Sequence, residues 1–203
     1  MGNIVITIGR EFSSGGRELA RRLAEELGFE YYDKEIVTEI AKKTSFSEQY
    51  IHEVIEKNPH ALYPITTGHT FSYIDTYALQ QKHAIFNEQE NVIKEMAAKS
   101  NCVIVGRCAD YILKDINPYR IFVYSDMKSK IARCKEKNDH QDGKLTDKQL
   151  IRYIKKVDRN RKHFYEFFTG REWGNKLNYD FCINTSKMNI EDIVPHLANM
   201  FKE

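Results

Sequence analysis

Five short apolar segments alternate with longer amphipathic stretches along this chain, and the alternation restricts its fold more than any other feature. The segments are Asn3–Ile8, Phe29–Tyr32, Cys102–Gly106, Arg120–Tyr124 and Tyr179–Asn184. Short, near-continuous apolar runs are typical of strands that are buried on both faces. Strands separated by helices need βαβ crossovers, so we predict an α/β fold with a five-stranded, mainly parallel sheet.

Helical sequence fills the intervals between these segments. Apolar residues recur at helical spacing from Arg17 to Leu27 and stop at Gly28, which is placed to end a helix. The other expected elements are helices over Glu35–Lys43 and Phe86–Lys99, a loop over His60–Ser72, two helices within Asp126–Phe168 that a polar turn at Asp139–Gly143 interrupts, and a final helix that Asn189 caps.

Composition and charge exclude several classes of protein. With 203 residues, 41% hydrophobic and 30% charged, the chain suits one globular domain with an inserted lid. The net charge of +2 is too balanced for a nucleic-acid partner. No apolar run approaches the roughly 18 residues of a membrane helix. The segment MGNIVITIGREF lacks the pattern of a signal peptide, so we expect a cytoplasmic protein with no membrane partner.

Cysteine and histidine spacing predicts neither a metal site nor a disulfide. The four cysteines, which are Cys102, Cys108, Cys134 and Cys182, form no C-x-x-C pair, and the seven histidines show no ligand spacing. We therefore expect reduced and mostly buried thiols. No Ser-His-Asp, Cys-His or paired-carboxylate arrangement can be placed either.

A loop rich in glycine and serine joins the first predicted strand to the first predicted helix. Backbone N–H groups of such a loop turn inward around phosphates, and the helix dipole adds favourable potential. The predicted phosphate-binding residues are Gly9, Arg10, Ser13, Ser14, Gly15, Gly16, Arg17 and Glu18. The loop departs from the G-x-x-x-x-G-K-S/T motif, because Gly16 stands where the lysine belongs and the next cation is Arg17. A plain strand-to-helix turn is the alternative, although it needs only one glycine.

Two further side chains follow predicted strands. Arg107 comes after Cys102–Gly106, and Asp33 comes after Phe29–Tyr32. Ligands of open α/β sheets bind beyond the carboxyl ends of the strands, so both side chains should face the same crevice as the glycine loop. A surface ion pair is the alternative for Arg107, and a structural role is equally open for Asp33.

The predicted helix Leu150–Phe168 continues an apolar stripe with charged residues. The residues that share one narrow face are Ile151, Ile154, Asp158, Arg161 and Tyr165. Charges on such a face are costly unless they are paired or hold a ligand. We predict that Asp158, Arg159 and Arg161 act on phosphoryl groups in transfer, with a structural ion pair as the alternative. Arg152, on the adjoining face, is expected to be solvated.

Aromatic residues gather at the end of the same helix. His163–Phe168, Trp173 and Tyr179 either stack a nucleobase or form core. Aromatic residues among lysines and arginines also occur in proteins that bind single-stranded nucleic acid, but the near-neutral charge argues against that function.

These segments together resemble the cytidylate kinase-like family, a branch of the P-loop nucleoside monophosphate kinases. The segments that carry the resemblance are IVITIGREFSSGGRELARRLAEELGFEYYDKEIV, CVIVGRCADYIL, KKVDRNRKHFYEFFTGREWG and NYDFCINTSKMNIEDIV. They span nearly the whole chain in the family's order. The resemblance implies a three-layer P-loop kinase fold in one domain over residues 1–203, with a helical acceptor-side insertion over 34–101 and a helical lid over 139–175.

The resemblance also implies an activity, which is ATP- and Mg²⁺-dependent phosphoryl transfer to a nucleoside monophosphate, CMP or dCMP first. Carried over by position, Gly9–Arg17 would hold the ATP phosphates and Arg107 would contact the acceptor. Asp158 and Arg161 would hold the cytosine end and the transferring phosphate. The implied catalytic residues are Arg17, Arg159 and Arg161, and the implied acceptor-binding residues are Asp33, Arg107, Asp158 and Arg161. No direct metal ligand is assigned, although Asp33 or Asp110 would reach Mg²⁺ through water.

Some positions depart from the family's pattern. Gly16 replaces the loop lysine, Glu18 replaces a small hydroxyl residue, and Cys108 replaces the aspartate of a Gly-Arg-Asp element. The acceptor segment Asp-Ser-Gly-Ala-x-Tyr-Arg becomes Asp33–Glu39, which lacks the arginine. The candidate replacement cations are Arg10, Arg17 and Lys34. A nucleotide-binding module without catalysis and a kinase of a non-nucleotide acceptor therefore remain alternatives, and a homo-oligomer is left open.

Overall fold

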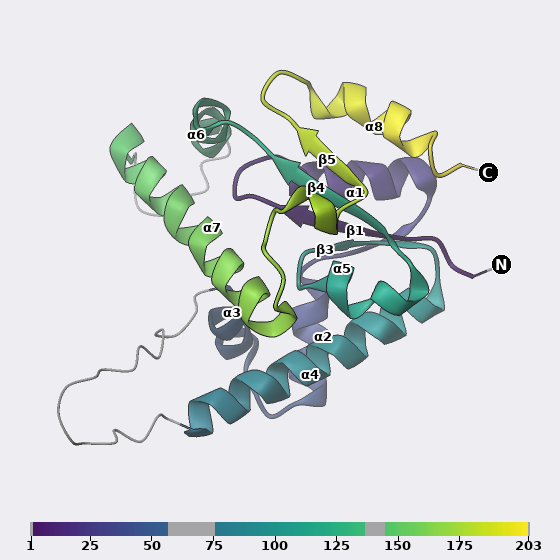
Figure 1. Cartoon of the computed structure of the whole chain (residues 1–203), viewed down its shortest axis with the longest axis vertical. Helices are drawn as coiled ribbons and strands as arrows, with labels where there is room; N and C mark the ends of the chain where they lie inside the picture. Colours follow the sequence, from purple (N-terminus) through teal and green to yellow (C-terminus); the bar gives the residue numbers. More distant parts are fainter. Residues whose placement is uncertain (1, 57–75, 137–144, 203) are drawn as a thin grey trace.

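The computed structural model of the chain describes residues 2–56, 76–136 and 145–202 (Figure 1). In chain order the elements are β1 Val5–Arg10, α1 Gly16–Leu27, β2 Glu30–Tyr32, α2 Glu35–Lys43, α3 Glu48–Glu56, α4 Thr76–Lys99, β3 Cys102–Val105, α5 Ala109–Ile112, β4 Tyr119–Tyr124, α6 Met127–Glu136, α7 Asp147–Thr169, β5 Phe181–Asn184 and α8 Ile190–Ala198. Two short 3-10 helices cover Lys114–Ile116 and Lys176–Asn178.

The described strands form one five-stranded sheet in the order β2-β3-β1-β4-β5, and every pairing is parallel. This confirms the α/β class and the five-stranded parallel sheet. The strands are short and their side chains alternate between the two faces. In β1, for example, Val5 contributes to one apolar core and Ile6 and Ile8 contribute to the other.

Helices cover both faces of the sheet, so the fold has three layers (Figure 1). On one face, α1 and α8 pack together over β1, β3 and β4. On the other face, α2, α3, α4 and α5 surround a second core, which Phe164 and Tyr165 of α7 complete. Because the side chains on both faces of the sheet are buried away from water, the strands are near-continuous apolar runs in the sequence.

Helix α7 lies across the carboxyl ends of the strands (Figure 1). It begins at a capping box in which the Thr146 side chain accepts from Gln149 N–H, and it ends before Gly170, which has a φ of 65°. The helix is therefore delimited at both ends by local sequence signals. Its position over the sheet edge brings its inner face against the glycine loop that follows β1.

Several element predictions change in the structure. Helix α4 begins at Thr76 rather than Phe86, and α3, within the predicted helical insertion over 34–101, was not predicted as a separate helix. Asn189 does occupy the N-cap of α8, but its side chain makes no capping hydrogen bond. The predicted loop His60–Ser72 and the predicted turn Asp139–Gly143 lie outside the described residues. No helix in the described ranges is both long and apolar enough to cross a lipid bilayer.

Candidate active site

The glycine loop runs from the end of β1 to the start of α1. Ser13 and Gly15 have φ values of 56° and 83°, in the left-handed region, and Gly15 is the N-cap of α1. Gly15 provides no side-chain cap, although Gly16 N–H donates to Ser14 Oγ over 3.4 Å. The amides that follow in the first turn of α1 have no partner within the helix and can bind an anion. Ser14 is buried, and its Oγ donates to Glu11 O over 2.9 Å. The loop therefore has the backbone geometry of an anion-binding nest.

Asp33 directly follows β2, and its buried carboxylate lies near two arginines of the glycine loop and of α1. Arg17 Nε lies 2.5 Å from Asp33 Oδ2, and Arg10 Nη2 lies 3.9 Å from Asp33 Oδ1. The Arg17 side chain is 55% exposed, whereas that of Arg10 is 9% exposed. Arg17 is thus held toward Asp33 at the rim of the loop, and Arg10 is the cation that lies inside.

Two cavities meet at the carboxyl end of the sheet. The first, the loop cavity, has a volume of about 220 Å³ and is lined by the glycine loop, Glu18, Arg133 and Arg161. The second, the inner cavity, has a volume of about 40 Å³ and lies between Gly106 and α7. Arg10 and Arg161 line both cavities. Arg161 Nη1 lies 3.5 Å from Arg10 O, which joins α7 to the end of β1.

The inner cavity takes its polar groups from the turn after β3. Gly106, Arg107 and Cys108 have φ values of 69°, 58° and 56°, and Arg107 is buried among the cavity's lining residues. Consecutive left-handed residues are costly and concentrate at functional sites. Buried Gln89 of α4 secures the turn, because its Nε2 donates to Arg107 O over 2.9 Å. Arg107 therefore lies beyond the carboxyl end of β3, in the lining of the inner cavity.

Asp110 is the one carboxylate among the described residues that line the inner cavity. Tyr165 Oη donates to its Oδ2 over 2.6 Å, and both side chains are buried. Burial raises the pKa of Asp110, and burial together with the Asp110 charge raises the pKa of Tyr165. Trp173 and Tyr179 complete an aromatic wall of this cavity. The predicted aromatic cluster therefore contributes both to core and to the cavity lining.

Comparison with known proteins identifies the family. The model of the cytidylate kinase-like family matches residues 5–187. The chain belongs to the cytidylate kinase-like family. A cytidylate kinase of Staphylothermus marinus is 24% identical over 190 residues, which is 93% of this chain and 90% of that protein.

Solved structures agree with the fold. An uncharacterised protein from Eubacterium ventriosum is 26% identical, with a TM-score of 0.67 and 98% of each chain covered. A shikimate kinase from Bacteroides thetaiotaomicron has the same coverage of both chains, 14% identity and a TM-score of 0.56, which shows the fold alone. Family and fold together support a nucleotide or small-molecule kinase.

In this member of the cytidylate kinase-like family, Asp158 contacts the glycine loop and lines neither cavity. Its Oδ1 accepts from Phe12 N–H over 2.6 Å, and its Oδ2 lies 3.1 Å from Lys130 Nζ. Lys130 is buried and also lies 2.8 Å from Glu11 Oε2. Burial raises the pKa of Asp158, while Lys130 opposes the shift. Asp158, predicted at the acceptor, instead holds α7 against the loop in this conformation.

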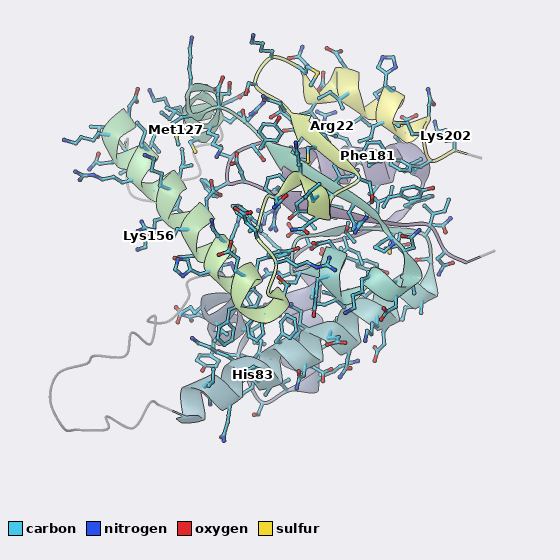
Figure 2. The ribbon with its side chains drawn as sticks, in the orientation of Figure 1. Arg22, His83, Met127, Lys156, Phe181 and Lys202 are labelled. Carbon is cyan, nitrogen blue, oxygen red and sulfur yellow. The ribbon has the colours of Figure 1, made fainter. Side chains whose placement is uncertain are left out.

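Arg159 also lies outside both cavities of this chain. Figure 2 shows Lys156 on the side of α7 that faces away from the sheet, and Arg159, one turn later, is likewise exposed. Of the predicted site arginines, Arg10, Arg107 and Arg161 line the inner cavity together, and Arg159 does not.

Arg133 is a cavity residue that the sequence did not single out. Its Nη2 donates to Thr185 O over 2.7 Å and its Nη1 donates to Ser125 Oγ over 3.2 Å. Arg133 and Glu18 also line a wider groove of about 500 Å³ beside Met188 and Asn189. The loop cavity therefore continues into an open groove between α6 and α8. Arg133 is one of several cations on α6, and nothing in the sequence distinguishes it from them.

Proposed function

We propose that this protein transfers the γ-phosphoryl group of ATP to a nucleoside monophosphate, with CMP or dCMP as the first acceptor to test. The observation that carries the proposal is the placement of Arg10 and Arg161, which line both the loop cavity and the inner cavity. A donor phosphate on the loop and an acceptor in the inner cavity would then share the same two cations. Membership of the cytidylate kinase-like family supports this assignment.

The charge of the inner cavity suits an anionic acceptor. Its lining contains the guanidinium groups of Arg10, Arg107 and Arg161 and the carboxylate of Asp110. An excess of positive charge remains even when Asp33, at 3.9 Å from Arg10 Nη2, is counted. A phosphate dianion would balance this excess, and guanidinium groups bind phosphate with paired hydrogen bonds. The aromatic wall and Asp110 are suited to the remainder of the acceptor, namely a planar base and its hydrogen-bond donors.

The donor would occupy the loop cavity and the groove beside it. Amides of the glycine loop and of the first turn of α1 would bind the phosphates, while Arg133 and the groove near Met188 and Asn189 would accept the nucleoside. Magnesium fits as an ion carried by the triphosphate and water. No trio of His, Cys, Asp or Glu side chains converges within the described ranges, and Asp33 or Asp110 would reach the ion through water.

The proposed reaction needs positioning rather than a general base. An oxygen of the acceptor phosphate forms a bond to the γ-phosphorus as the bond to the ADP oxygen breaks, and the acceptor oxygen is already anionic. Arg10 and Arg161 would neutralise the charge on the transferring group, which is the main contribution a protein makes to such a reaction.

Helix α7 would act as the lid of this site. A volume of about 40 Å³ holds a few water molecules, whereas ligand pockets span roughly 300 to 1,000 Å³. An acceptor nucleotide therefore requires α7 to move outward and then to return with Arg161. Closure of this kind excludes water from the transferring group.

Two alternatives each have one favouring observation. The small inner cavity favours a small non-nucleotide acceptor, and the absence of a lysine at Gly16 favours a nucleotide-binding module without turnover.

The experiment measures ADP release from ATP and Mg²⁺ across a panel of nucleoside monophosphates, CMP and dCMP included. Acceptor-dependent turnover with a nucleotide is expected. ATP binding without turnover on any nucleotide would reject the proposal in favour of the alternatives.

A further inference from the structure

The glycine loop of this chain carries its cation at the first position of the motif, whereas the usual motif carries its cation after the last glycine. When Gly15 and Gly16 are aligned with the G-K pair of G-x-x-x-x-G-K-S/T, the first glycine of the motif falls at position 10 and the lysine at position 16. This chain has Arg10 and Gly16 at those two positions. A glycine and a cation have therefore exchanged places.

The structure shows that these two positions are in contact. A Cβ atom at position 16 would lie 2.6 Å from Arg10 Cβ and 3.3 Å from Arg10 Cγ. Real Cβ atoms essentially never approach another heavy atom this closely. A lysine at position 16 is thus incompatible with an arginine at position 10, and each arrangement needs glycine at the other position.

The Arg10 side chain runs from the loop toward the acceptor side. A Cβ atom at Gly106 would overlap Arg10 Nη1, so glycines at 16 and 106 both leave room for this side chain. The guanidinium group lines both cavities and is 9% exposed at the side chain. Arg17, the next cation after the missing lysine, pairs with Asp33 over 2.5 Å at the rim, whereas Arg10 Nη2 lies at 3.9 Å from the same carboxylate.

We propose that Arg10 supplies the cation that the loop lysine supplies in standard P-loops, reaching the donor phosphates from the end of β1. This inference rests on the proposed function, because it assigns Arg10 to ATP phosphates in the same site. Arg10 then contributes to binding through the phosphates rather than through the base. It also contributes to turnover, because it lies between donor and acceptor.

The test uses the full chain with the substitutions Arg10→Gln, Arg10→Gly, Gly16→Lys and the double substitution Arg10→Gly/Gly16→Lys. Arg21→Gln is the control, since Arg21 is exposed on α1 and pairs only with Glu25 among its described contacts. Calorimetry measures binding of ATP and of inorganic tripolyphosphate, which carries phosphates without a base. Thermal unfolding of each variant identifies any that does not fold.

Arg10→Gln is expected to weaken binding of both ATP and tripolyphosphate by at least about tenfold and to lower turnover by about 100-fold or more. Gly16→Lys alone is expected to impair the loop, and the double substitution to recover at least about tenfold over Arg10→Gly. A merely structural role for Arg10 predicts no such recovery. Binding of ATP and tripolyphosphate by folded Arg10→Gln within about threefold of wild type would overturn the inference.

These outcomes separate the inference from the proposed function. If wild type binds ATP and Arg10→Gln does not, but no acceptor supports turnover, the role of Arg10 stands and the kinase proposal fails. If wild type turns over a nucleotide and Arg10→Gln does so equally well, the kinase proposal stands and the role of Arg10 fails. If wild type binds neither ATP nor tripolyphosphate, both are rejected.

Discussion

Replacing Lys130 with methionine removes the buried cation that connects the glycine loop to α7. Its Nζ lies 2.8 Å from Glu11 Oε2 and 3.1 Å from Asp158 Oδ2. Without it, the two carboxylates remain with oxygens at most about 6 Å apart, and at an effective dielectric of about 20 they repel by about 3 kcal/mol. Partial exposure of both carboxylates reduces this figure through solvent screening. We therefore expect Lys130→Met to lower the free energy of unfolding by about 2 kcal/mol.

Chemical denaturation measures this loss, and the chain offers a matched control. Lys135 of α6 pairs with Asp147 of α7 over 2.6 Å, between the same two helices, but the two side chains are 55% and 62% exposed. Lys135→Met should cost less than about 1 kcal/mol. Adding Asp158→Asn to Lys130→Met should recover stability, because it removes the repulsion. Equal losses for the two lysine substitutions would refute the reasoning.

Two further predictions concern the cavities. Burial raises the pKa of Asp110, so the ionised carboxylate lowers the stability of the folded protein at pH values above the raised pKa. This loss of stability shrinks as the pH falls below the raised pKa, and it is absent below the ordinary pKa of an aspartate. At neutral pH the Asp110→Asn variant should therefore melt at the same temperature as wild type or at a higher one, and the difference should shrink in acid. Its KM for the acceptor should rise. A melting temperature that falls below that of wild type, most of all at neutral pH, would contradict this. Gly15→Ala should cost more stability than Gly28→Ala, since both glycines have positive φ but only at Gly15 would the Cβ meet a side chain, Ile190 Cδ1 at 2.5 Å. Equal losses in the free energy of unfolding for the two substitutions would contradict this, because they would show that the loop accommodates the added Cβ atom without cost.

The fold was largely predictable because its strands are buried on both faces. Apolar runs such as Cys102–Gly106 have no other explanation in a chain with turn and helix signals on either side. Helix α3, Glu48–Glu56, escaped prediction because its apolar residues form a short stripe that gains stability only by packing. Helix α4 begins ten residues before its predicted start. Contacts of this early part with distant residues, such as Gln81 with Tyr50 and His83 with Phe168, cannot be read from the sequence.

The site was predictable in position but not in side-chain direction. The carboxyl ends of parallel strands meet at one edge, so the glycine loop and Arg107 could be placed together from the sequence. The sequence does not show which cation is buried at the cavities, because Arg17 pairs with Asp33 and stays exposed while Arg10 is buried. Lys130 was missed as a site neighbour, because a buried charge is recognisable only by partners that are distant in the sequence, here Glu11 and Asp158.

In the proposed reaction, Arg161 connects a donor on the loop with an acceptor in the inner cavity. The most direct measurement is kcat/KM for phosphoryl transfer from ATP to CMP or the best acceptor of the panel, in wild type, Arg161→Ala and Arg152→Ala. Arg152 is an exposed residue of the same helix, α7. We predict a loss of about 100-fold or more for Arg161→Ala and less than about threefold for Arg152→Ala. A loss within about threefold for Arg161→Ala, under roughly 1 kcal/mol of barrier, would contradict the claim.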